Sequence, residues 1–407
     1  MNEFDVVVIG GGPAGLAASK KASEFGSVLL IEREGRLGGI LKQCIHDGFG
    51  VTRFKTKLSG PEYANREIEA LKQTDVQVKL FTFVTGINKG EDGFEITYVN
   101  MDGVEKVHAK KLIFSTGCRE RTAKQIQIHG TNPAGVMTAG QAQYYMNILG
   151  KMPIKKAVIL GSGDIGLIMA RRITLEGGKV EGVYEVKSTP SGLTRNIVQC
   201  LEDFNIPLHL SHTVTKVFGR DRLEAVEIAQ VDEKMRPIKG TERKIECDSL
   251  ILSVGLVPEN DLASSLGVPL SKKTKGPYVD QNFMTMVEQI YACGNAVHVN
   301  DLADFVSESG EIAGNKLPQH ERKLIEVKED SHFLYVVPQY VDINSKTEKM
   351  VFYFRSKNEY KDKKLVVKQG DEILLQRKYS FLKPPEMEKI LISTKNNEPI
   401  EFSLEDE

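Results

Sequence analysis

The sequence predicts an α/β protein with two doubly wound nucleotide-binding domains and a small antiparallel β domain at its C-terminal end. Three observations predict this fold. A strand, glycine turn, helix and strand unit occurs twice, at 6–32 and at 158–185. Apolar runs typical of buried parallel strands recur between and after these units. Residues 315–407 contain only one of the 36 glycines, Gly370, and change to an alternating apolar and polar pattern.

The composition excludes several classes of protein. The 407 residues carry 54 basic and 55 acidic side chains, so no charge excess indicates a nucleic acid or an anionic membrane as partner. The five cysteines are widely spread without a C-x-x-C pair, which argues against a zinc site and predicts no metal. The first apolar stretch, FDVVVIGGGPAG, is broken by glycines and lacks a basic region before it. We therefore expect neither a signal peptide nor a membrane span, and a cytoplasmic location.

The predicted parallel strands follow one another in a simple order. Their ranges are 5–9, 28–31, 111–114, 157–160, 182–185 and 249–254. Several lead directly into glycine turns and helical patterns, which is the order of elements in doubly wound domains. After Gly314 we expect alternating strands at 350–355, 364–368 and 389–393, in a small β domain.

The first glycine motif follows the first strand and has the spacing G-x-G-x-x-G. It reads Gly10-Gly11-Gly12-Pro13-Ala14-Gly15. The first glycine allows the tight turn, the second lets the backbone approach a pyrophosphate, and the third lets the helix pack on the strand. The free N–H groups at the helix start favour a phosphate. Glu32 ends the next strand, where a carboxylate can accept from ribose hydroxyls.

The second glycine motif repeats this pattern and predicts a second dinucleotide. It reads Gly161-Ser162-Gly163-Asp164-Ile165-Gly166, and Glu185 ends the following strand. A carboxylate at that place accepts from both ribose hydroxyls and repels a 2′-phosphate, so NADH is expected over NADPH. Lys187 lies two residues further and could weaken that preference.

Several further strings resemble those of a known family. They are Glu32-Arg33 with Leu37-Gly38-Gly39, the strand end Ile113-Phe114-Ser115-Thr116-Gly117, the segment Gly255-Leu256-Val257-Pro258, and Ile290-Tyr291-Ala292-Cys293-Gly294-Asn295. Together with the glycine motifs, they make residues 1–314 similar to the two-dinucleotide flavoproteins of the pyridine nucleotide-disulfide oxidoreductase superfamily. The resemblance implies two Rossmann-like domains, one for FAD and one for NAD, of the glutathione-reductase type.

The resemblance also implies domain limits and cofactor contacts. The FAD domain would comprise residues 1–115 and 249–314, the NAD domain 116–248, and the β domain 315–407. FAD would lie against Gly10, Gly12, Pro13, Ala14, Gly15, Glu32, Arg33, Gly38, Gly39, Val84, Thr116, Gly117, Gly294 and Asn295. NAD(H) would lie against Gly161, Gly163, Asp164, Ile165, Gly166, Glu185 and Gly255.

One position departs from the family pattern. The family usually has Asp where this chain has Asn295, so an amide replaces the carboxylate beside the ribityl chain. An amide can accept from a hydroxyl through its carbonyl oxygen. We therefore expect FAD to be kept.

The region around Cys44 leaves two interpretations open. The disulfide reductases of the superfamily carry paired cysteines, whereas LGGILKQCIHDGFG contains only Cys44. Single-cysteine members of the superfamily place one reactive thiol against the flavin, and His46 could lower the pKa of that thiol. Cys44 and His46 are therefore candidate catalytic residues. The alternative is that Cys44 is a small buried packing residue.

The longer strings are closest to one branch of the superfamily. SGPEYA, STGCRERTAKQIQIHGTNPAGVMTAGQAQ and ACGNAVHVNDLADFVSESGEIAG resemble flavoprotein subunits that accompany amino-acid and glycerol 3-phosphate dehydrogenases. This implies an oligomer with a flavin dehydrogenase subunit, and with an iron-sulfur protein if the complex has a cluster. Two rival hypotheses are a stand-alone NADH peroxidase or low-molecular-weight disulfide reductase using Cys44, and a structural flavoprotein subunit.

Overall fold

The computed structural model describes residues 2–316, 320–345 and 347–406. The chain forms two compact units, of which the first comprises 1–118 and 258–407 and the second comprises 119–257. The strands β9 (Cys118–Glu120) and β19 (Leu256–Pro258) carry the chain from one unit to the other and back.

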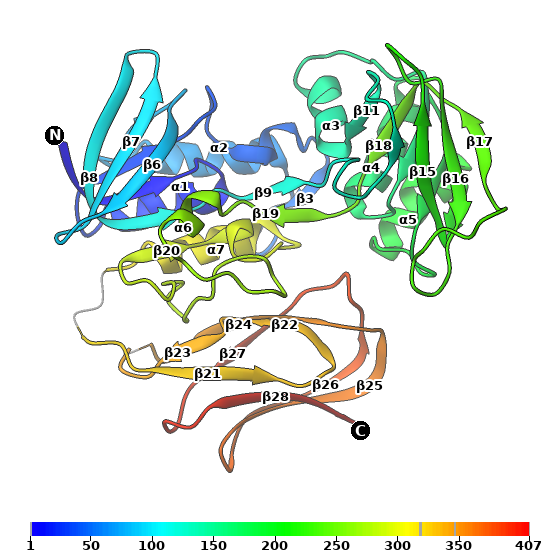
Figure 1. Cartoon of the computed structure of the whole chain (residues 1–407). Helices are drawn as coiled ribbons and strands as arrows, with labels where there is room; N and C mark the ends of the chain where they lie inside the picture. Colours follow the sequence, from blue (N-terminus) through cyan, green and yellow to red (C-terminus); the bar gives the residue numbers. More distant parts are fainter. Residues whose placement is uncertain (1, 317–319, 346, 407) are drawn as a thin grey trace. The chain divides into compact units, whose positions relative to one another are not determined.

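The first unit is built around a seven-stranded sheet (Figure 1). Its order is β5-β2-β1-β8-β7-β6, and β20 pairs with β8. The strands are β1 (Asn2–Ile9), β2 (Val28–Ile31), β5 (Gln77–Lys79), β6 (Phe83–Lys89), β7 (Phe94–Asn100), β8 (Gly103–Phe114) and β20 (Ile290–Ala292). The strands β5, β2, β1, β8 and β20 are parallel, whereas β6, β7 and β8 form an antiparallel meander.

The helices of this unit are short, and a glycine allows two of them to pack closely. They are α1 (Pro13–Ala22), η1 (Gly39–Gln43), α2 (Gly60–Leu71), α6 (Asp261–Ser265), η3 (Gly294–Ala296) and α7 (Ala303–Ala313), and a small pair, β3 (Asp47–Phe49) with β4 (Leu58–Ser59), precedes α2. A Cβ built at Gly310 of α7 would lie 2.1 Å from the carbonyl oxygen of Ala14 in α1. Only a residue without a side chain permits this approach, so Gly310 fixes the contact between α1 and α7.

The second unit repeats the parallel architecture on a smaller scale. A five-stranded parallel sheet has the order β11-β18-β12-β13-β14, and a four-stranded sheet has the order β10-β15-β16-β17. The strands are β10 (His129–Gly130), β11 (Val136–Thr138), β12 (Lys156–Leu160), β13 (Lys179–Glu185), β14 (Leu208–Leu210), β15 (His212–Phe218), β16 (Ala225–Gln230), β17 (Arg243–Glu246) and β18 (Ser249–Leu252). The helices are α3 (Ala139–Asn147), α4 (Asp164–Leu175), α5 (Thr194–Cys200) and η2 (Glu202–Phe204).

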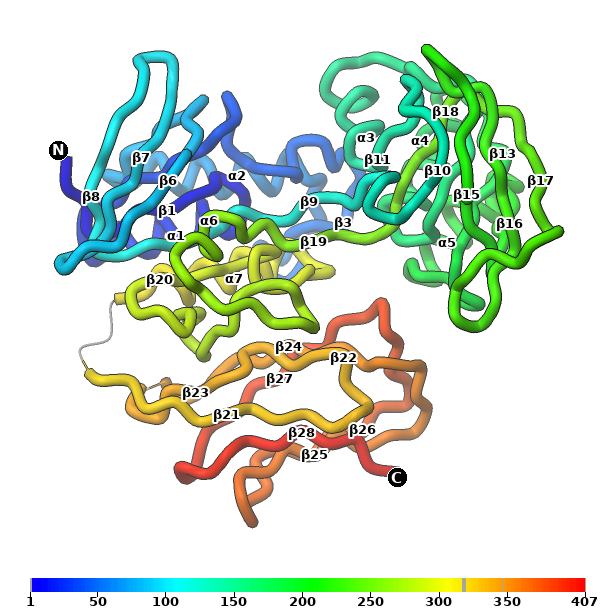
Figure 2. Tube along the Cα trace, viewed as in Figure 1, coloured from blue at the N-terminus to red at the C-terminus, as the bar shows by residue number. Residues whose placement is uncertain are grey.

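The C-terminal part of the first unit is a two-layer β domain. A sheet of order β23-β21-β28-β25-β26 faces a smaller sheet of order β22-β24-β27, as the yellow to red end of the trace in Figure 2 shows. Its strands are β21 (Leu324–Glu329), β22 (Phe333–Val337), β23 (Tyr340–Asp342), β24 (Met350–Ser356), β25 (Tyr360–Gln369), β26 (Glu372–Leu382), β27 (Glu388–Ile392) and β28 (Ile400–Asp406). Buried Tyr335, Val337, Tyr353 and Met387 of this domain belong to the apolar core of the seven-stranded sheet. The β domain therefore shares a core with the domain that precedes it.

The predicted fold class is confirmed, whereas the two compact units have other limits than the predicted domains: the first break lies at 118, and residues 315–407 fall within the first unit. The sequence predicts that the second segment of the first domain begins at residue 249. Instead, β18 pairs with β11 and β12 in the second unit, and the chain returns at Pro258. The apolar run 249–254 cannot reveal this, because a buried strand has the same sequence in either sheet.

Replacing Gly310 by Val should destabilise the first unit by about 2 kcal/mol, because the added side chain must push α7 away from α1. Thermal unfolding would show a lower midpoint. Gly86→Ala is the matched control, since a Cβ there meets nothing within 4 Å. Equal midpoints for the Gly310 variant and the control would contradict the assignment.

Candidate functional site

The first glycine motif forms a tight turn between β1 and α1. Gly10 has a φ of 106°, and a Cβ there would lie 2.4 Å from the carbonyl oxygen of Ser115. A Cβ at Gly15 would lie 1.8 Å from the carbonyl oxygen of Gly10. At Gly12, by contrast, the nearest atom to a built Cβ is 3.9 Å away, on Gly39. The first and third glycines are thus required for packing, while the second leaves its side of the backbone open.

The helices after the two glycine motifs start without a side-chain cap. Gly12 is the N-cap of α1 and Gly163 is the N-cap of α4, and neither makes a side-chain cap hydrogen bond. The helices α2 and α3 are capped by Ser59 and Thr138, while α5, α6 and α7 also lack a side-chain cap. An uncapped helix start combines free N–H donors with the positive end of the helix dipole. This arrangement suits a phosphate at both motifs.

Glu32 is held rigidly beside the first motif. Its side chain is buried, and its two carboxylate oxygens accept from the backbone N–H of Gly11 at 2.7 Å and of Glu34 at 2.8 Å. Each oxygen keeps a second lone pair for a further donor. The carboxylate is therefore oriented before any ribose hydroxyl arrives.

The other residues predicted for the first site surround this turn. The N–H of Gly38 donates to the carbonyl oxygen of Gly11 at 2.8 Å, and a Cβ at Gly39 would meet the Cα of Gly12 at 2.9 Å. A Cβ at Gly294 would lie 2.9 Å from that of Ala14. Val84 is buried on β6, close in sequence to Thr82, whose N–H donates to the carbonyl oxygen of Glu32.

Three predicted residues have other surroundings. Thr116 Oγ1 donates to the carbonyl oxygen of Glu259 at 2.5 Å, and Gly117 takes a φ of 72° at the exit of the strand. The side chain of Arg33 is exposed beyond Glu32. Thr116 and Gly117 thus shape the backbone at the end of β8.

The second motif has the same construction in the second unit. Gly161 has a φ of 99°, and a Cβ there would lie 2.0 Å from the carbonyl oxygen of Ser253, while one at Gly166 would lie 2.7 Å from that of Gly161. Glu185 is buried and accepts from Ser162 N–H at 3.0 Å and from Ser162 Oγ at 2.5 Å. Gly11 and Ser162 thus occupy equivalent places in the two repeats.

The remaining residues predicted for the second site lie around α4. Asp164 accepts from the N–H of Leu193 at 2.9 Å and from Asn196 Nδ2 at 2.7 Å, which ties the loop after β13 to the helix start. Ile165 is half-buried in the first turn of α4, and Gly255 takes a φ of 95° after β18.

Two serines belong to these turns and were not predicted. Ser115 Oγ lies 2.9 Å from the carbonyl oxygen of Ile9 and 2.8 Å from that of Gly10. Ser253 Oγ accepts from the N–H of Gly166 at 3.0 Å. The sequence contains a signal for both, since Phe114-Ser115-Thr116-Gly117 and Leu252-Ser253-Val254-Gly255 share the same spacing of Ser and Gly after an apolar run, and each run pairs with the strand that leads into a glycine motif.

The amide of Asn295 acts differently from the expectation. Its Oδ1 accepts from the N–H of Asn300 at 3.0 Å and from Asn300 Nδ2 at 3.2 Å, and Nδ2 lies 3.5 Å from Cys118 Sγ. A carbonyl oxygen has two lone pairs, and both are used here. Asn295 is therefore expected to donate through Nδ2 rather than to accept from a ribityl hydroxyl.

Cys44 is packed against the start of α2. Its Sγ donates to the carbonyl oxygen of Ile40 at 3.4 Å, and a Cβ at Gly60 would lie 2.8 Å from that of Cys44. Burial raises the pKa of the Cys44 thiol to about 12. The ring of His46 lies on Phe49, with 5.1 Å between centroids. A thiol that stays protonated favours the packing interpretation over the nucleophilic one.

The other cysteines occupy separate places. Cys293 is fully buried at the end of β20, whereas Cys200 and Cys247 are buried in the second unit. Within residues 2–316, 320–345 and 347–406, no cluster of three His, Cys, Asp or Glu side chains could hold a metal ion. Among the helices of the described residues, none has the length and apolar character of a membrane span.

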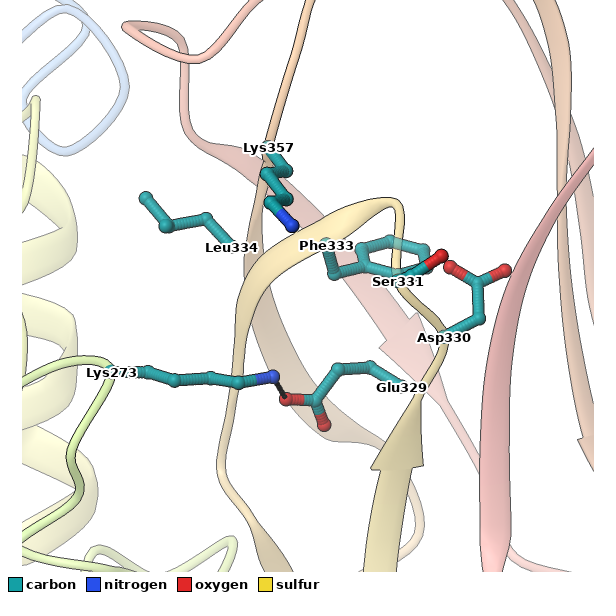
Figure 3. Close-up of a pocket in the computed structure, with 7 residues that line it drawn as sticks. All are labelled: Lys273, Glu329, Asp330, Ser331, Phe333, Leu334 and Lys357. Carbon is teal, nitrogen blue, oxygen red and sulfur yellow. Dashed lines mark hydrogen bonds and ion pairs between the residues drawn. The ribbon is translucent and has the colours of Figure 1, made fainter. Parts of the chain in front are cut away.

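A surface pocket of about 330 Å³ lies elsewhere, against the β domain (Figure 3). It is lined by Lys273, Glu329, Asp330, Ser331, Phe333, Leu334 and Lys357. Lys273 and Glu329 close one side with an ion pair of 2.5 Å. None of these residues belongs to either glycine motif.

Two uncapped glycine turns, each with a buried carboxylate, define a protein with the architecture of two dinucleotide-binding domains. Residues 4–315 match the pyridine nucleotide-disulphide oxidoreductase family, and the chain belongs to this family. The cofactors of this family are FAD and a nicotinamide dinucleotide. The residues of the first unit fit FAD, since the open side of Gly12, the uncapped α1 and the second lone pairs of Glu32 match a pyrophosphate and a ribose.

Known relatives match a large part of the chain. Hydrogen cyanide synthase subunit HcnB of Pseudomonas protegens is 26% identical over 287 residues, which cover 64% of this chain and 58% of HcnB. An opine oxidase subunit of Agrobacterium tumefaciens is 24% identical over 330 residues, covering 76% and 64%. The chain thus spans about three fifths of the length of these relatives. Thioredoxin reductase of T. acidophilum superimposes with a TM-score of 0.62 at 22% identity, covering 77% of this chain and 97% of that one.

Replacing Glu32 by Gln should weaken FAD binding at least about tenfold, because an amide cannot accept from both backbone N–H groups and also serve a ribose. Equilibrium titration of the apoprotein with FAD measures this. Glu34→Gln, which changes an exposed side chain two residues away, is the control and should bind like the wild type. Unchanged affinity for the Glu32 variant would remove Glu32 from the site.

Proposed function

We propose that this protein is an FAD-dependent NAD(H) oxidoreductase that passes a hydride between nicotinamide and flavin. We further propose that it is a component of a glycerol 3-phosphate or amino-acid dehydrogenase complex. A partner flavoprotein would oxidise the organic substrate, and any iron-sulfur centre would lie on a partner.

The observation that supports this proposal most directly is that a glycine turn with a buried glutamate occurs in both units. In each unit, a buried glutamate at the end of the second strand binds the backbone of the second residue of the motif, at 2.7 Å for Glu32 and 3.0 Å for Glu185. A glycine turn kept only for packing would not need this buried charge, because burying a carboxylate is costly unless it is paired. The construction therefore favours two working dinucleotide sites over one.

The chain's own residues bind and orient in this proposal. When bound, FAD and NAD(H) supply the hydride chemistry between flavin N5 and nicotinamide C4. The helix starts of α1 and α4 hold the phosphates, Glu32 and Glu185 hold the riboses, and Asn295 donates to the flavin side. No side chain has to act as a nucleophile in the exchange, which agrees with the raised pKa of the Cys44 thiol.

The names of two relatives support a role in a complex. HcnB is a subunit of hydrogen cyanide synthase, and the relative from Agrobacterium tumefaciens is a subunit of opine oxidase. The β domain lies outside the family match, which ends at residue 315, so it is the part where a specific partner would be recognised.

Anaerobic titration with NADH tests the proposal. The Cys44→Ser variant distinguishes it from the hypothesis of an NADH peroxidase or disulfide reductase that uses Cys44. We expect about one NADH per flavin to bleach the oxidised flavin band in both the wild type and the variant. Dye reduction should also be equal, because the hydride exchange needs no thiol and the pKa of the half-buried Cys44 is raised.

Two results would contradict this. A flavin that NADH leaves oxidised would indicate a structural flavoprotein subunit. Loss of NADH-dependent peroxide reduction in the Cys44 variant alone would support the peroxidase hypothesis.

Replacing Glu185 by Ala should raise the ratio of kcat/KM for NADPH to that for NADH by about tenfold or more, since the repulsion of a 2′-phosphate is lost. Steady-state dye reduction with each nucleotide measures the ratio. Glu176→Gln, at the far end of α4 beside Arg172, should leave the ratio unchanged. A wild type that already prefers NADPH would overturn the assignment of Glu185.

A further inference from the structure

Arg355 of β24 reaches from the β domain to the loop that follows Gly294 and Asn295. Its side chain is largely buried. Nη2 donates to Asp301 Oδ1 and to the carbonyl oxygen of Val299, the latter at 3.3 Å. On the β-domain side, Nε donates to Tyr335 Oη at 2.8 Å, and Nη1 donates to the carbonyl oxygens of Pro384 and Pro385 at 3.2 and 2.5 Å. These contacts account for all five N–H donors of a guanidinium.

The residues of the loop 298–301 make further contacts with the β domain. Asp301 Oδ2 accepts from the N–H of Met387 at 2.6 Å, so both oxygens of this carboxylate bind the β domain. The ring of His298 is buried between Tyr335 and Tyr353, with centroids 5.6 and 5.4 Å away. The loop 298–301 is therefore shaped by the β domain rather than by its own helix.

Asn300 connects this loop to Asn295, a residue of the predicted FAD site. Asn300 lies between Val299 and Asp301, the two residues that Nη2 of Arg355 binds. Its backbone N–H and its Nδ2 both donate to Asn295 Oδ1. These two bonds fix the amide plane of Asn295, with one N–H of Nδ2 directed to Cys118 Sγ at 3.5 Å and the second N–H left as a further donor. One guanidinium thus fixes the residues on either side of the group that orients Asn295.

We propose that Arg355 is a positioning residue for the flavin, through which the β domain sets the orientation of Asn295 and is required for tight FAD binding. This inference rests on the proposed function, in which Gly294 and Asn295 contact FAD. It assigns the β domain a role in the cofactor site in addition to any docking of partners.

A lysine cannot replace Arg355 in this role. The three N–H donors of lysine are all on one nitrogen. The five N–H donors of Arg355 are on three nitrogens of a planar group and point in three directions. Arg355→Lys keeps the positive charge beside Asp301, so it separates geometry from charge. Arg355→Met removes both.

Tyr353→Phe is the matched control. Tyr353 lies two residues away on β24 and also contacts the first domain, where its Oη donates to Glu308 Oε2 at 2.7 Å. Glu308 is in the middle of α7 and not in the loop 298–301. The control therefore removes one buried hydrogen bond at the same interface while leaving Asn295 in place.

The experiment measures FAD affinity of the apoproteins and the midpoint potential of the FAD-saturated proteins. We expect both Arg355 variants to bind FAD about tenfold more weakly than the wild type and Tyr353→Phe to stay within about twofold. We also expect a more negative potential in the Arg355 variants, because a loosened loop holds the Nδ2 donor of Asn295 less well to stabilise negative charge on reduced flavin. A merely structural contact would not move the potential of the saturated protein.

The outcomes separate the inference from the proposed function. A wild type that does not bind FAD would overturn both. A wild type that binds FAD, with Arg355→Lys matching it in affinity and potential, would overturn the inference alone. An equal loss in Tyr353→Phe would also overturn it, since any weakening of the interface would then suffice. Arg355→Lys keeps the test valid if Arg355→Met does not fold.

Discussion

The close approach of backbone to backbone at the two glycine turns is the constraint on which the dinucleotide sites depend. In each turn, the strand end, the helix start and the end of a neighbouring strand meet at distances that exclude a Cβ, as at Gly15 against Gly10 and at Gly161 against Ser253. This contact aims the helix start at one point. A phosphate can be held there by N–H groups without any cationic side chain.

The buried glutamates follow from the same geometry. Parallel pairing sets Ile9 beside Ile31 and Leu160 beside Tyr184, so each glycine turn stands next to the residue that ends the second strand. A carboxylate there is desolvated, and the N–H of Gly11 or Ser162 offsets that cost. The proposed phosphate and ribose contacts would thus both follow from one strand register.

The β domain extends the first unit rather than standing beside it. Tyr335, Val337, Tyr353 and Met387 complete the apolar core of the seven-stranded sheet, while Arg355 ties the loop after Asn295 to the β domain. A domain that shares its core with the cofactor domain can influence the cofactor. This explains how a segment outside the family match can belong to the working part of the molecule.

The sequence by itself determined the two motifs, their acids and the class of fold, because glycine spacing and strand ends act over a few residues. Local pattern could not place β18 in the second unit and could not reveal that Asn295 Oδ1 is already bound by Asn300. Only the tertiary structure decided these points, and it also brought Arg355 to residues more than 50 positions earlier in the chain. The physical reason is that burial, lone-pair occupancy and strand partners depend on residues far apart in the chain, which meet only in the folded molecule.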